Sequence, residues 1–502
     1  MNRSLFPQSL RAQTLCGLLI AVATLALSSC HSAAYYYYKF PQFTFANRPI
    51  PPSKLANRVM VSVSVNGTQG SLPILDAKRD IRSNVENTIP SFAISGYSSG
   101  FPNLILNFPE QVHGYVYSDL LGDVQIIDYS KESNAGSAGT FPPKSSSLAI
   151  PPTFTRIYSA SETSGQLVVI DNTVGQTYAL NLPGVYKVAA NQGDTIVLAM
   201  VRNTDAVYRL IKLTQNQYPT ADLPVKQLGA IDCQPFNLPI YCVVPVTDNP
   251  NNPSFDRPIG AYFSLDGTTV DLLNCGAECG GSKSSVTMLN PAALTIDVLP
   301  TAPPPYPTPV VSTIPVPGGV TTALSDGTTL YVAGQQEQPD GLFTGFLSTL
   351  NLAAMVSSPS TAITGTYSIS DGTHTKLLFA DDNTLWIGSQ YCSVGERQKL
   401  NQNYNCLTRF DLGAKTAQVI PNVTPGGATT VAFPNTNRNL YYYGDLTGLC
   451  WVQTFHKVYT AYGGQVHAFN TADGSEINNQ FITVQGTALD VAYLDAVTNG
   501  DN

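Results

Sequence analysis

The sequence predicts an all-β protein built from repeated small antiparallel sheets, and three observations support this. Charged residues make up only 12 % of the 502 residues, while glycine (39), proline (36) and tyrosine (26) are plentiful. This composition favours short strands joined by many turns over helices, which need long runs of alanine, leucine, glutamate and lysine. Short apolar stretches also recur along the chain, and tight-turn residues precede several of them. A chain of this length can bury a large core.

The N-terminus carries an export signal. Arg3 and Arg11 supply positive charge, and the apolar stretch over 15–27 is too short to cross about 30 Å of hydrocarbon. The stretch ends in the sequence LSSC at 27–30, which resembles the lipobox of bacterial lipoproteins. The resemblance implies cleavage before Cys30 and a lipid on its thiol as the membrane anchor. The alternative is an ordinary signal peptide with an incidental cysteine.

The chain then divides into four parts. Tyrosines and a proline-rich run without apolar periodicity follow the lipobox, which predicts a tether that holds the body away from the bilayer. The parts are a signal peptide (1–29), a lipidated tether (30–54), a folded domain (55–496) and a C-terminal tail (497–502).

One unit recurs through the folded domain: an apolar strand, a polar loop, and a second strand that ends near Asp or Asn. The first strands lie at 59–63, 115–118, 157–160, 196–199, 270–273, 330–333, 385–388 and 440–443. Second strands lie at 124–128, 167–171, 407–411 and 466–470. Small antiparallel meanders spaced by about 40 to 75 residues are typical of β-propeller blades.

Several units resemble the YVTN-type and NHL-type propeller repeats of bacterial surface proteins. The sequence FSLDGT at 263–268 is close to the Phe-Ser-Pro-Asp-Gly turn before the second blade strand, with Leu265 where proline is usual. The segments 325–328 and 381–384 occupy the same place, and their Asp-Gly and Asp-Asn pairs tolerate positive φ. The resemblance covers roughly residues 55 to 495 and implies architecture rather than activity.

The two ends of the domain are expected to pair. The stretch 488–494 resembles the first strand of a blade with nothing after it, and the segment from Val59 begins like a second strand. Their pairing would complete one composite blade and remove two open edges. The sequence therefore predicts seven or eight blades of antiparallel meander sheets, closed by the N- and C-terminal strands.

Seven cysteines lie after Cys30 in the sequence, and six of them form close pairs. Local pairs in an exported protein predict disulfides. The pairs are Cys233 with Cys242, Cys275 with Cys279, and Cys392 with Cys406. Metal binding at 275–279 is the disfavoured alternative, because no second cluster completes a site. Cys450 remains unpaired.

Loop length predicts a recognition surface. The loops between second and third strands of the blades share one face, and they are short early in the chain: 119–122, 161–165 and 202–205. Longer loops are expected at 276–283, 335–342, 390–405 and 444–464. Large aromatic side chains on long loops often make binding surfaces. The predicted partner-binding residues are Tyr391, Tyr404, Trp451, Phe455, Tyr459 and Tyr462.

Charge and motif content exclude several functions. The formal charge of −8 becomes −10 once the two leader arginines are removed, and no basic cluster occurs, so nucleic-acid binding is not expected. No metal site or cofactor is expected, since the acidic loop at 248–256 lacks the spacing of a calcium loop. No catalytic set is found: Asp266, Asp326 and Asp381 are better explained as turn residues.

The sequence therefore predicts a lipid-anchored extracytoplasmic propeller in the cell envelope, at the outer membrane or on its periplasmic or cell-surface side. It would bind or scaffold an envelope protein or glycan without catalysis, since carbohydrate stacks well on Tyr and Trp. The alternative is a propeller enzyme, such as a lactonase or a quinone-dependent dehydrogenase, with its site at the mouth of the central channel.

Overall fold

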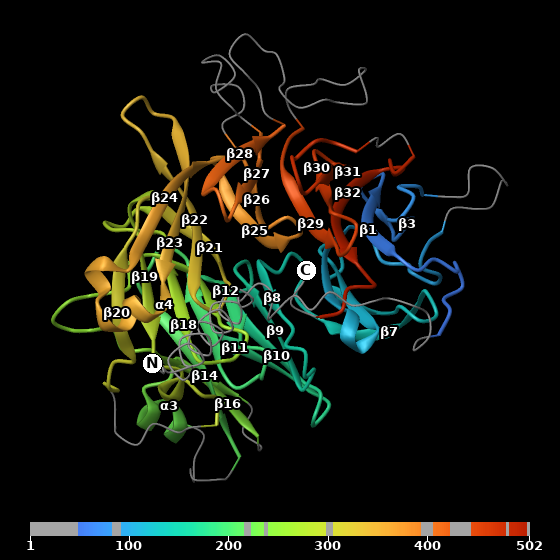
Figure 1. Ribbon diagram of the computed structural model, residues 1–502. Coiled ribbons are helices and arrows are strands. Elements are labelled where there is room, and N and C mark those ends of the chain that lie inside the picture. Colours follow the sequence, from blue (N-terminus) through green and yellow to red (C-terminus); the bar gives the residue numbers. More distant parts are fainter. Residues whose placement is uncertain are drawn as a thin grey trace, which may run out of the picture.

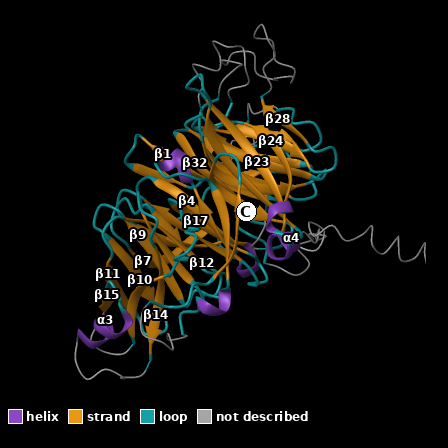
Figure 2. Ribbon diagram, turned by 90° about the vertical axis from the view of Figure 1, so that its left-hand side faces the viewer, coloured by secondary structure: helices purple, strands orange, loops and turns teal. Residues whose placement is uncertain are grey.

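Eight antiparallel sheets stand around a common centre as the blades of a β-propeller, as the computed structural model shows (Figure 1). The structure describes residues 49–82, 92–214, 222–234, 239–297, 305–392, 405–421, 443–477 and 481–498. Strands make up most of this body, and the few helical turns lie at its periphery (Figure 2). The all-β propeller prediction is confirmed, and the number of blades is eight.

Blades 1 to 4 follow in chain order, each with its first strand innermost. Blade 1 comprises β4 (Pro102–Phe108), β5 (His113–Ser118), β6 (Asp123–Asp128) and β7 (Ser133–Thr140). Blade 2 comprises β8 (Ser147–Ala149), β9 (Arg156–Ser161), β10 (Gln166–Asp171) and β11 (Gln176–Asn181). Blade 3 comprises β12 (Val185–Ala190), β13 (Val197–Val201), β14 (Val207–Leu213), β16 (Ile240–Pro245) and β15 (Asp232–Gln234). Blade 4 comprises β17 (Pro258–Phe263), β18 (Val270–Asn274), β19 (Ser285–Leu289) and β20 (Val310–Pro315).

Blades 5 to 8 complete the ring. Blade 5 comprises β21 (Gly319–Ser325), β22 (Thr329–Glu337), β23 (Phe343–Asn351) and β24 (Ile363–Ile369). Blade 6 comprises β25 (Thr373–Ala380), β26 (Thr384–Gln390), β27 (Leu407–Asp411) and β28 (Thr416–Ile420). Blade 7 comprises β29 (Leu446–Val452), β30 (Lys457–Tyr462) and β31 (Gln465–Asn470). Blade 8 comprises β32 (Thr487–Tyr493), β1 (Arg58–Val65), β2 (Gln69–Ser71) and β3 (Ile74–Asp76).

Short helical segments interrupt the loops. They are η2 (Pro109–Gln111), α3 (Asp222–Leu228), η3 (Gly276–Cys279), η4 (Pro291–Ala293), α4 (Leu352–Ser357) and η5 (Pro359–Thr361).

The last strand closes the ring against the first. β32 pairs with β1 in antiparallel register from Val59 opposite Tyr493 to Ser64 opposite Thr487, as expected from the sequence. In Figure 1 the red β32 lies beside the blue β1. Residues 49–54, assigned from the sequence to the tether, already reach the body, because the Ser53 amide donates to Glu132 of blade 1 at 2.8 Å. The signal peptide and the rest of the tether lie outside the described residues.

Strand alternation gives the propeller two distinct ends. The loops between second and third strands share one end with the crossovers from each blade to the next, and this end is called the crossover face. The other end, the hairpin face, carries the loops between first and second strands. The turns at 264–269, 326–328 and 381–383 lie on the hairpin face, immediately before second strands, as the repeat resemblance implied.

The recurring apolar strands found in the sequence are mostly second and third blade strands. For example, 115–118 lies in β5 and 385–388 in β26, whereas the inner strands β17 and β21 were not anticipated. The predicted strand at 440–443 falls, except for Tyr443, outside the described residues. Hydrophobic faces of neighbouring blades pack against each other; one such core joins Tyr331 of blade 5, Trp386 of blade 6 and Tyr462 of blade 7.

Candidate functional site

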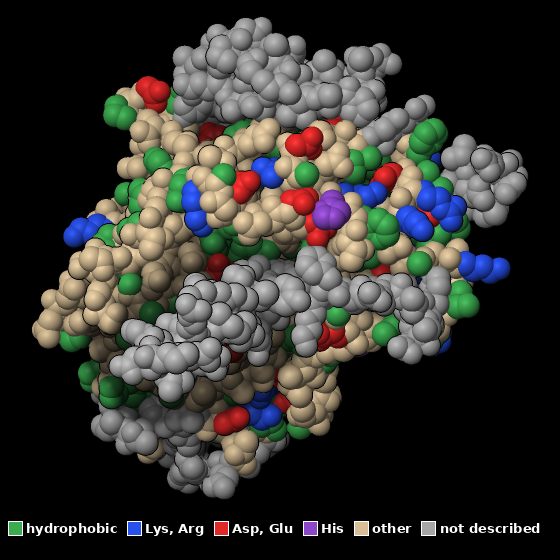
Figure 3. All heavy atoms as spheres, viewed as in Figure 1, with side chains coloured by type: hydrophobic (Ala, Val, Ile, Leu, Met, Phe, Trp, Pro, Cys, Tyr) green, Lys and Arg blue, Asp and Glu red, His purple; other side chains and the backbone are tan. Residues whose placement is uncertain are grey.

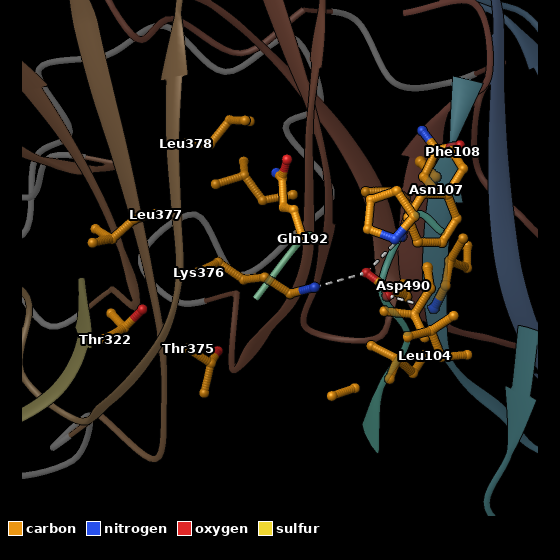
Figure 4. Close-up of a pocket in the computed structure, with 18 of the residues that line it drawn as sticks. Leu104, Asn107, Phe108, Gln192, Thr322, Thr375, Lys376, Leu377, Leu378 and Asp490 are labelled. Atoms are coloured by element: carbon orange, nitrogen blue, oxygen red, sulfur yellow. Dashed lines mark hydrogen bonds and ion pairs between the residues drawn. The ribbon is translucent and has the colours of Figure 1, made fainter. Parts of the chain in front are cut away.

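The inner strands enclose a central channel that contains a cavity of about 430 Å³. The cavity extends from the middle of the channel toward the hairpin face, and the inner strands of seven blades contribute to its wall. Most of the wall is apolar, with Leu104, Leu377, Leu378 and Val491 among its residues (Figure 4). Concave, mostly apolar cavities with few polar groups are the usual form of small-ligand sites.

A repeated backbone irregularity places residues at one level of the channel. Seven of the eight inner strands carry a β-bulge near the crossover face, where the register against the second strand shifts by one residue. A bulge bends its strand locally and changes the direction of the side chains beside it. We call the residues that follow the bulges the bulge ring: Leu104, Lys187, Gly260, Thr322, Lys376, Gly448 and Asp490.

The bulge ring contains a buried carboxylate bound from three sides. Asp490 of β32 accepts hydrogen bonds from the backbone amides of Ile105 (2.9 Å) and Val491 (3.0 Å). Lys376 of β25 reaches the same carboxylate across the channel, with Nζ 3.3 Å from Oδ1 (Figure 4). Burial raises the pKa of Asp490, and the neighbouring Lys376 opposes that rise. The carboxylate thus joins blades 6, 8 and 1 around the channel.

A glycine of blade 7 makes room for this ion pair. A Cβ added at Gly448 would lie 2.6 Å from Val491 N and 2.7 Å from both Asp490 Cα and Oδ1. Gly260 holds the same ring position in blade 4, but a Cβ there would meet only Leu273 at 3.6 Å and a carbonyl at 4.0 Å.

We therefore expect Gly448→Ala to destabilise the fold by roughly 1–3 kcal/mol, because the added methyl group overlaps backbone that cannot easily move. The matched variant Gly260→Ala should unfold close to the wild type. Urea unfolding curves measure both. Equal unfolding midpoints for the two variants would show that ring position 448 is not sterically restricted.

Asn107 of the cavity wall is hydrogen-bonded within the fold. Asn107 donates to Tyr493 O at 2.9 Å and accepts from the Tyr129 hydroxyl at 2.6 Å. His374 of β25 is buried, and burial lowers its pKa to about 4, so it is neutral at physiological pH. Among the described residues, no group of three His, Cys, Asp or Glu side chains converges in a way that could hold a metal ion.

The acidic turn candidates are not among the residues that line the cavity. Asp266 and Asp326 accept hydrogen bonds from nearby turn amides at 3.0 Å and 2.9 Å. Asp381 accepts from Trp451 Nε1 at 2.9 Å and from the His456 amide at 3.0 Å. All three stabilise hairpin-face turns, as expected from the sequence.

The carboxylate of Asp248, in the acidic loop at 248–256, is likewise bound by backbone amides. It accepts from the amides of Asn249, Ser254 and Phe255 at 2.6 to 3.0 Å, which folds the crossover from blade 3 to blade 4.

The three predicted disulfides are confirmed. Cys233–Cys242 joins β15 to β16, Cys275–Cys279 closes the η3 turn of blade 4, and Cys392–Cys406 joins the two ends of the β26–β27 loop. The last two lie on the crossover face. Cys450 is buried within β29 without a disulfide, and burial raises the pKa of its thiol.

The prediction of one long loop over 444–464 is wrong, because this segment contains β29 and β30. Trp451, Tyr459 and Tyr462 of these strands are buried at 0–1 % exposure, so they form core rather than surface. The Tyr459 hydroxyl and Lys457 both bind Asp80, which joins blade 7 to blade 8.

The remaining aromatic candidates differ in position. Phe455 lies in the hairpin-face turn between β29 and β30 and packs partly against the core. Tyr391 is 77 % exposed and lies on the crossover face, beside the Cys392–Cys406 disulfide. Tyr404 lies outside the described residues. Of the predicted partner-binding residues that the structure describes, Tyr391 alone is exposed on the predicted face.

The Lys376–Asp490 pair was not predicted from the sequence. The available signal was a single charge directly before an apolar run, Lys376 before Leu377 and Asp490 before Val491. A lone charge of this kind in a strand is usually paired or faces water.

The fold and channel define an eight-bladed propeller. No family model matches the sequence, and no curated protein matches it. Dihydro-heme d1 dehydrogenase NirN is similar in structure with a TM-score of 0.48 and 12 % identity, covering 92 % of this chain and 84 % of NirN.

Two further solved structures are similar at the same level. Kuenenia stuttgartiensis hydrazine synthase has a TM-score of 0.44 and 12 % identity, covering 78 % of this chain and 99 % of that one. The Cps50 (Swd1) β-propeller domain of Myceliophteria thermophila has a TM-score of 0.43 and 10 % identity, covering 76 % and 96 %. These likenesses concern the fold.

Two further observations concern the charges on the surface and the helices. On the face drawn in Figure 3, basic and acidic side chains are scattered, and no continuous basic patch appears. Within the described residues, no helix is both long enough and apolar enough to cross a membrane.

Proposed function

We propose that this chain is a lipid-anchored extracytoplasmic propeller that binds or scaffolds an envelope protein or glycan without catalysis. The crossover face is its recognition surface. Three disulfides support an oxidising compartment outside the cytoplasm. The lipobox-like sequence supports attachment through Cys30.

One observation carries the binding proposal: the crossover-face loops are bonded to one another from blade to blade. The Glu337 amide of blade 5 donates to Glu278 of blade 4 at 3.0 Å, and the Gly372 amide of blade 6 donates to Gln335 of blade 5 at 2.8 Å. Further bonds of this kind join Arg202 to Glu162, Arg257 to Asn203, and Tyr391 to Asp445. A surface fixed in this way loses little conformational entropy on binding a partner.

The binding proposal predicts contact at Tyr391, whose amide bond to Asp445 and neighbouring disulfide hold an exposed aromatic ring in place. A photo-reactive phenylalanine analogue replaces Tyr391 in one protein and the exposed Val174 of the hairpin-face end of blade 2 in the control. We expect a discrete cross-linked species in intact envelopes from position 391 and none from position 174. Equal cross-linking at both positions, or none at 391, would contradict a recognition surface there.

The anchoring proposal predicts that Cys30→Ser abolishes palmitate labelling and moves the protein out of the membrane fraction. The thiol is required because it is the atom that carries the lipid. Cys450→Ser, which removes a buried thiol, is the control and should keep both the label and the membrane association. A Cys30→Ser protein that remains labelled would rule out Cys30 as the lipidated residue.

A further inference from the structure

One lysine on the inner strands, Lys187, has no ionic partner among the described residues. The eight inner strands contain three side chains that are charged at neutral pH: Lys187, Lys376 and Asp490. Lys376 and Asp490 form an ion pair, so the charge of Lys187 remains. The inner strands thus carry two lysines and one aspartate, one positive charge in excess, in a chain whose formal charge is −8.

Lys187 and Lys376 occupy equivalent places in the propeller. Each follows the bulge of its inner strand, and in each case the next blade has a glycine at the same ring position, Gly260 or Gly448. Two blades beyond Lys376 the ring position is Asp490, its partner. Two blades beyond Lys187 the position is Thr322, which has no charge. The geometry that supplies Lys376 with a carboxylate therefore supplies Lys187 with none.

Lys187 combines access to solvent with dense protein surroundings. Its side chain is accessible to solvent, yet the protein atoms around it lower its pKa. Within the described residues, Lys187 has no ion pair and no side-chain hydrogen bond. In such an environment an opposite charge is attracted more strongly than at an open surface.

We propose that the channel binds a small organic anion, a carboxylate or a phosphate monoester, whose charged group contacts Lys187 and whose apolar part enters the cavity. β12 connects the two regions, because Ala190 lines the cavity three residues beyond Lys187. Three residues of extended strand span roughly 10 Å. An anionic group at Lys187 with an apolar chain of that length would reach the level of Ala190, where the apolar cavity begins on β12.

Calorimetric titration of the intact mature protein with matched eight-carbon probes tests the proposal. We expect octanoate or octyl phosphate to bind, and octanol and octylammonium to bind at least about tenfold more weakly, because they lack the charge that Lys187 attracts. The stronger of the two anions identifies the head group. Inorganic phosphate alone should bind weakly, because it leaves the apolar cavity empty.

Three variants assign the site. Lys187→Gln should weaken binding of the preferred anion at least about tenfold, Lys187→Arg should largely preserve it, and Lys78→Gln, at an exposed lysine of the hairpin face, should not change it. Thermal unfolding confirms that each variant folds. Absence of anion binding, equal binding of octanol, or unchanged binding to Lys187→Gln would overturn the proposal. None of these outcomes bears on cross-linking at Tyr391, so the two proposals can fail separately.

Discussion

Replacement of Asp271 by asparagine should remove a pH dependence of stability that this one side chain imposes on the propeller. Asp271 lies on β18 and is fully buried, and its Oδ1 has no hydrogen-bond partner. Thr269 Oγ1 donates to the other oxygen at a long 3.4 Å. Its neighbours across the strands are Tyr262 and Met288, in the core between blades 4 and 5. No ion pair reaches this carboxyl within the described residues.

Burial raises the pKa of Asp271 to about 7. The unfolded chain ionises near 4, so between about pH 4 and 7 the folded state holds a proton that the unfolded state has lost. Wild-type stability from this group is therefore fully present below pH 4, falls as the pH rises, and levels off above 7. Three pKa units correspond to about 4 kcal/mol.

We expect the difference in free energy of unfolding between Asp271→Asn and the wild type to grow by about 4 kcal/mol from pH 4 to pH 8, in favour of the variant. Asparagine keeps the shape and cannot ionise. Urea unfolding at several pH values measures this difference. The control Asp340→Asn, at an exposed loop residue, should follow the wild-type profile. Parallel profiles for Asp271→Asn and the wild type would show that Asp271 is neutralised in another way.

Loss of Arg58 should weaken the closure of the ring. This side chain is 2 % exposed and its guanidinium binds Asp495 at 2.8 Å and Glu132 at 3.0 Å, both also buried. It also donates to Tyr129 O at 2.6 Å. Asp495 follows the closing strand β32, whereas Tyr129 and Glu132 belong to blade 1. One cation therefore joins β1 both to the end of β32 and to blade 1.

Arg58→Met should reduce the free energy of unfolding by about 3–5 kcal/mol, because it leaves two buried carboxylates without their cation. The comparison is Lys131→Met, which breaks an equally short ion pair with Asp128 (2.8 Å) whose lysine is 75 % exposed, and which should leave unfolding almost unchanged. Chemical unfolding of the three proteins separates the cases. A similar midpoint for Arg58→Met and the wild type would mean that strand pairing alone maintains closure.

Much of the architecture could be predicted from the sequence because second and third blade strands are buried on both sides. Strands such as β10 (Gln166–Asp171) and β26 (Thr384–Gln390) are therefore continuous apolar runs. Inner strands such as β21 carry glycine and threonine beside the channel, and their apolar pattern is too weak to detect. The same weakness explains the error at 444–464, since Thr447 and Gly448 interrupt the pattern of β29.

The channel site could not be predicted in this way. Lys376 and Asp490 are separated by 114 residues, and they meet only because blades 6 and 8 curve around a common axis. The bulge that aligns Lys187 with Lys376 is a property of strand register, which no single segment of sequence displays. By contrast, the local disulfide pairs could be predicted, because their partners are at most 14 residues apart.

The pairing of β1 with β32 has a consequence for the order in which the molecule assembles. Ser62 contacts Asp490 across a separation of 428 residues, so one edge of β1 stays unpaired until the chain has been made as far as β32. Contacts this distant in sequence form slowly, since a very large loop must close first. A chain without β32 therefore exposes two unpaired strand edges. A shortened protein that lacks β32 would tend to aggregate rather than form a smaller ring.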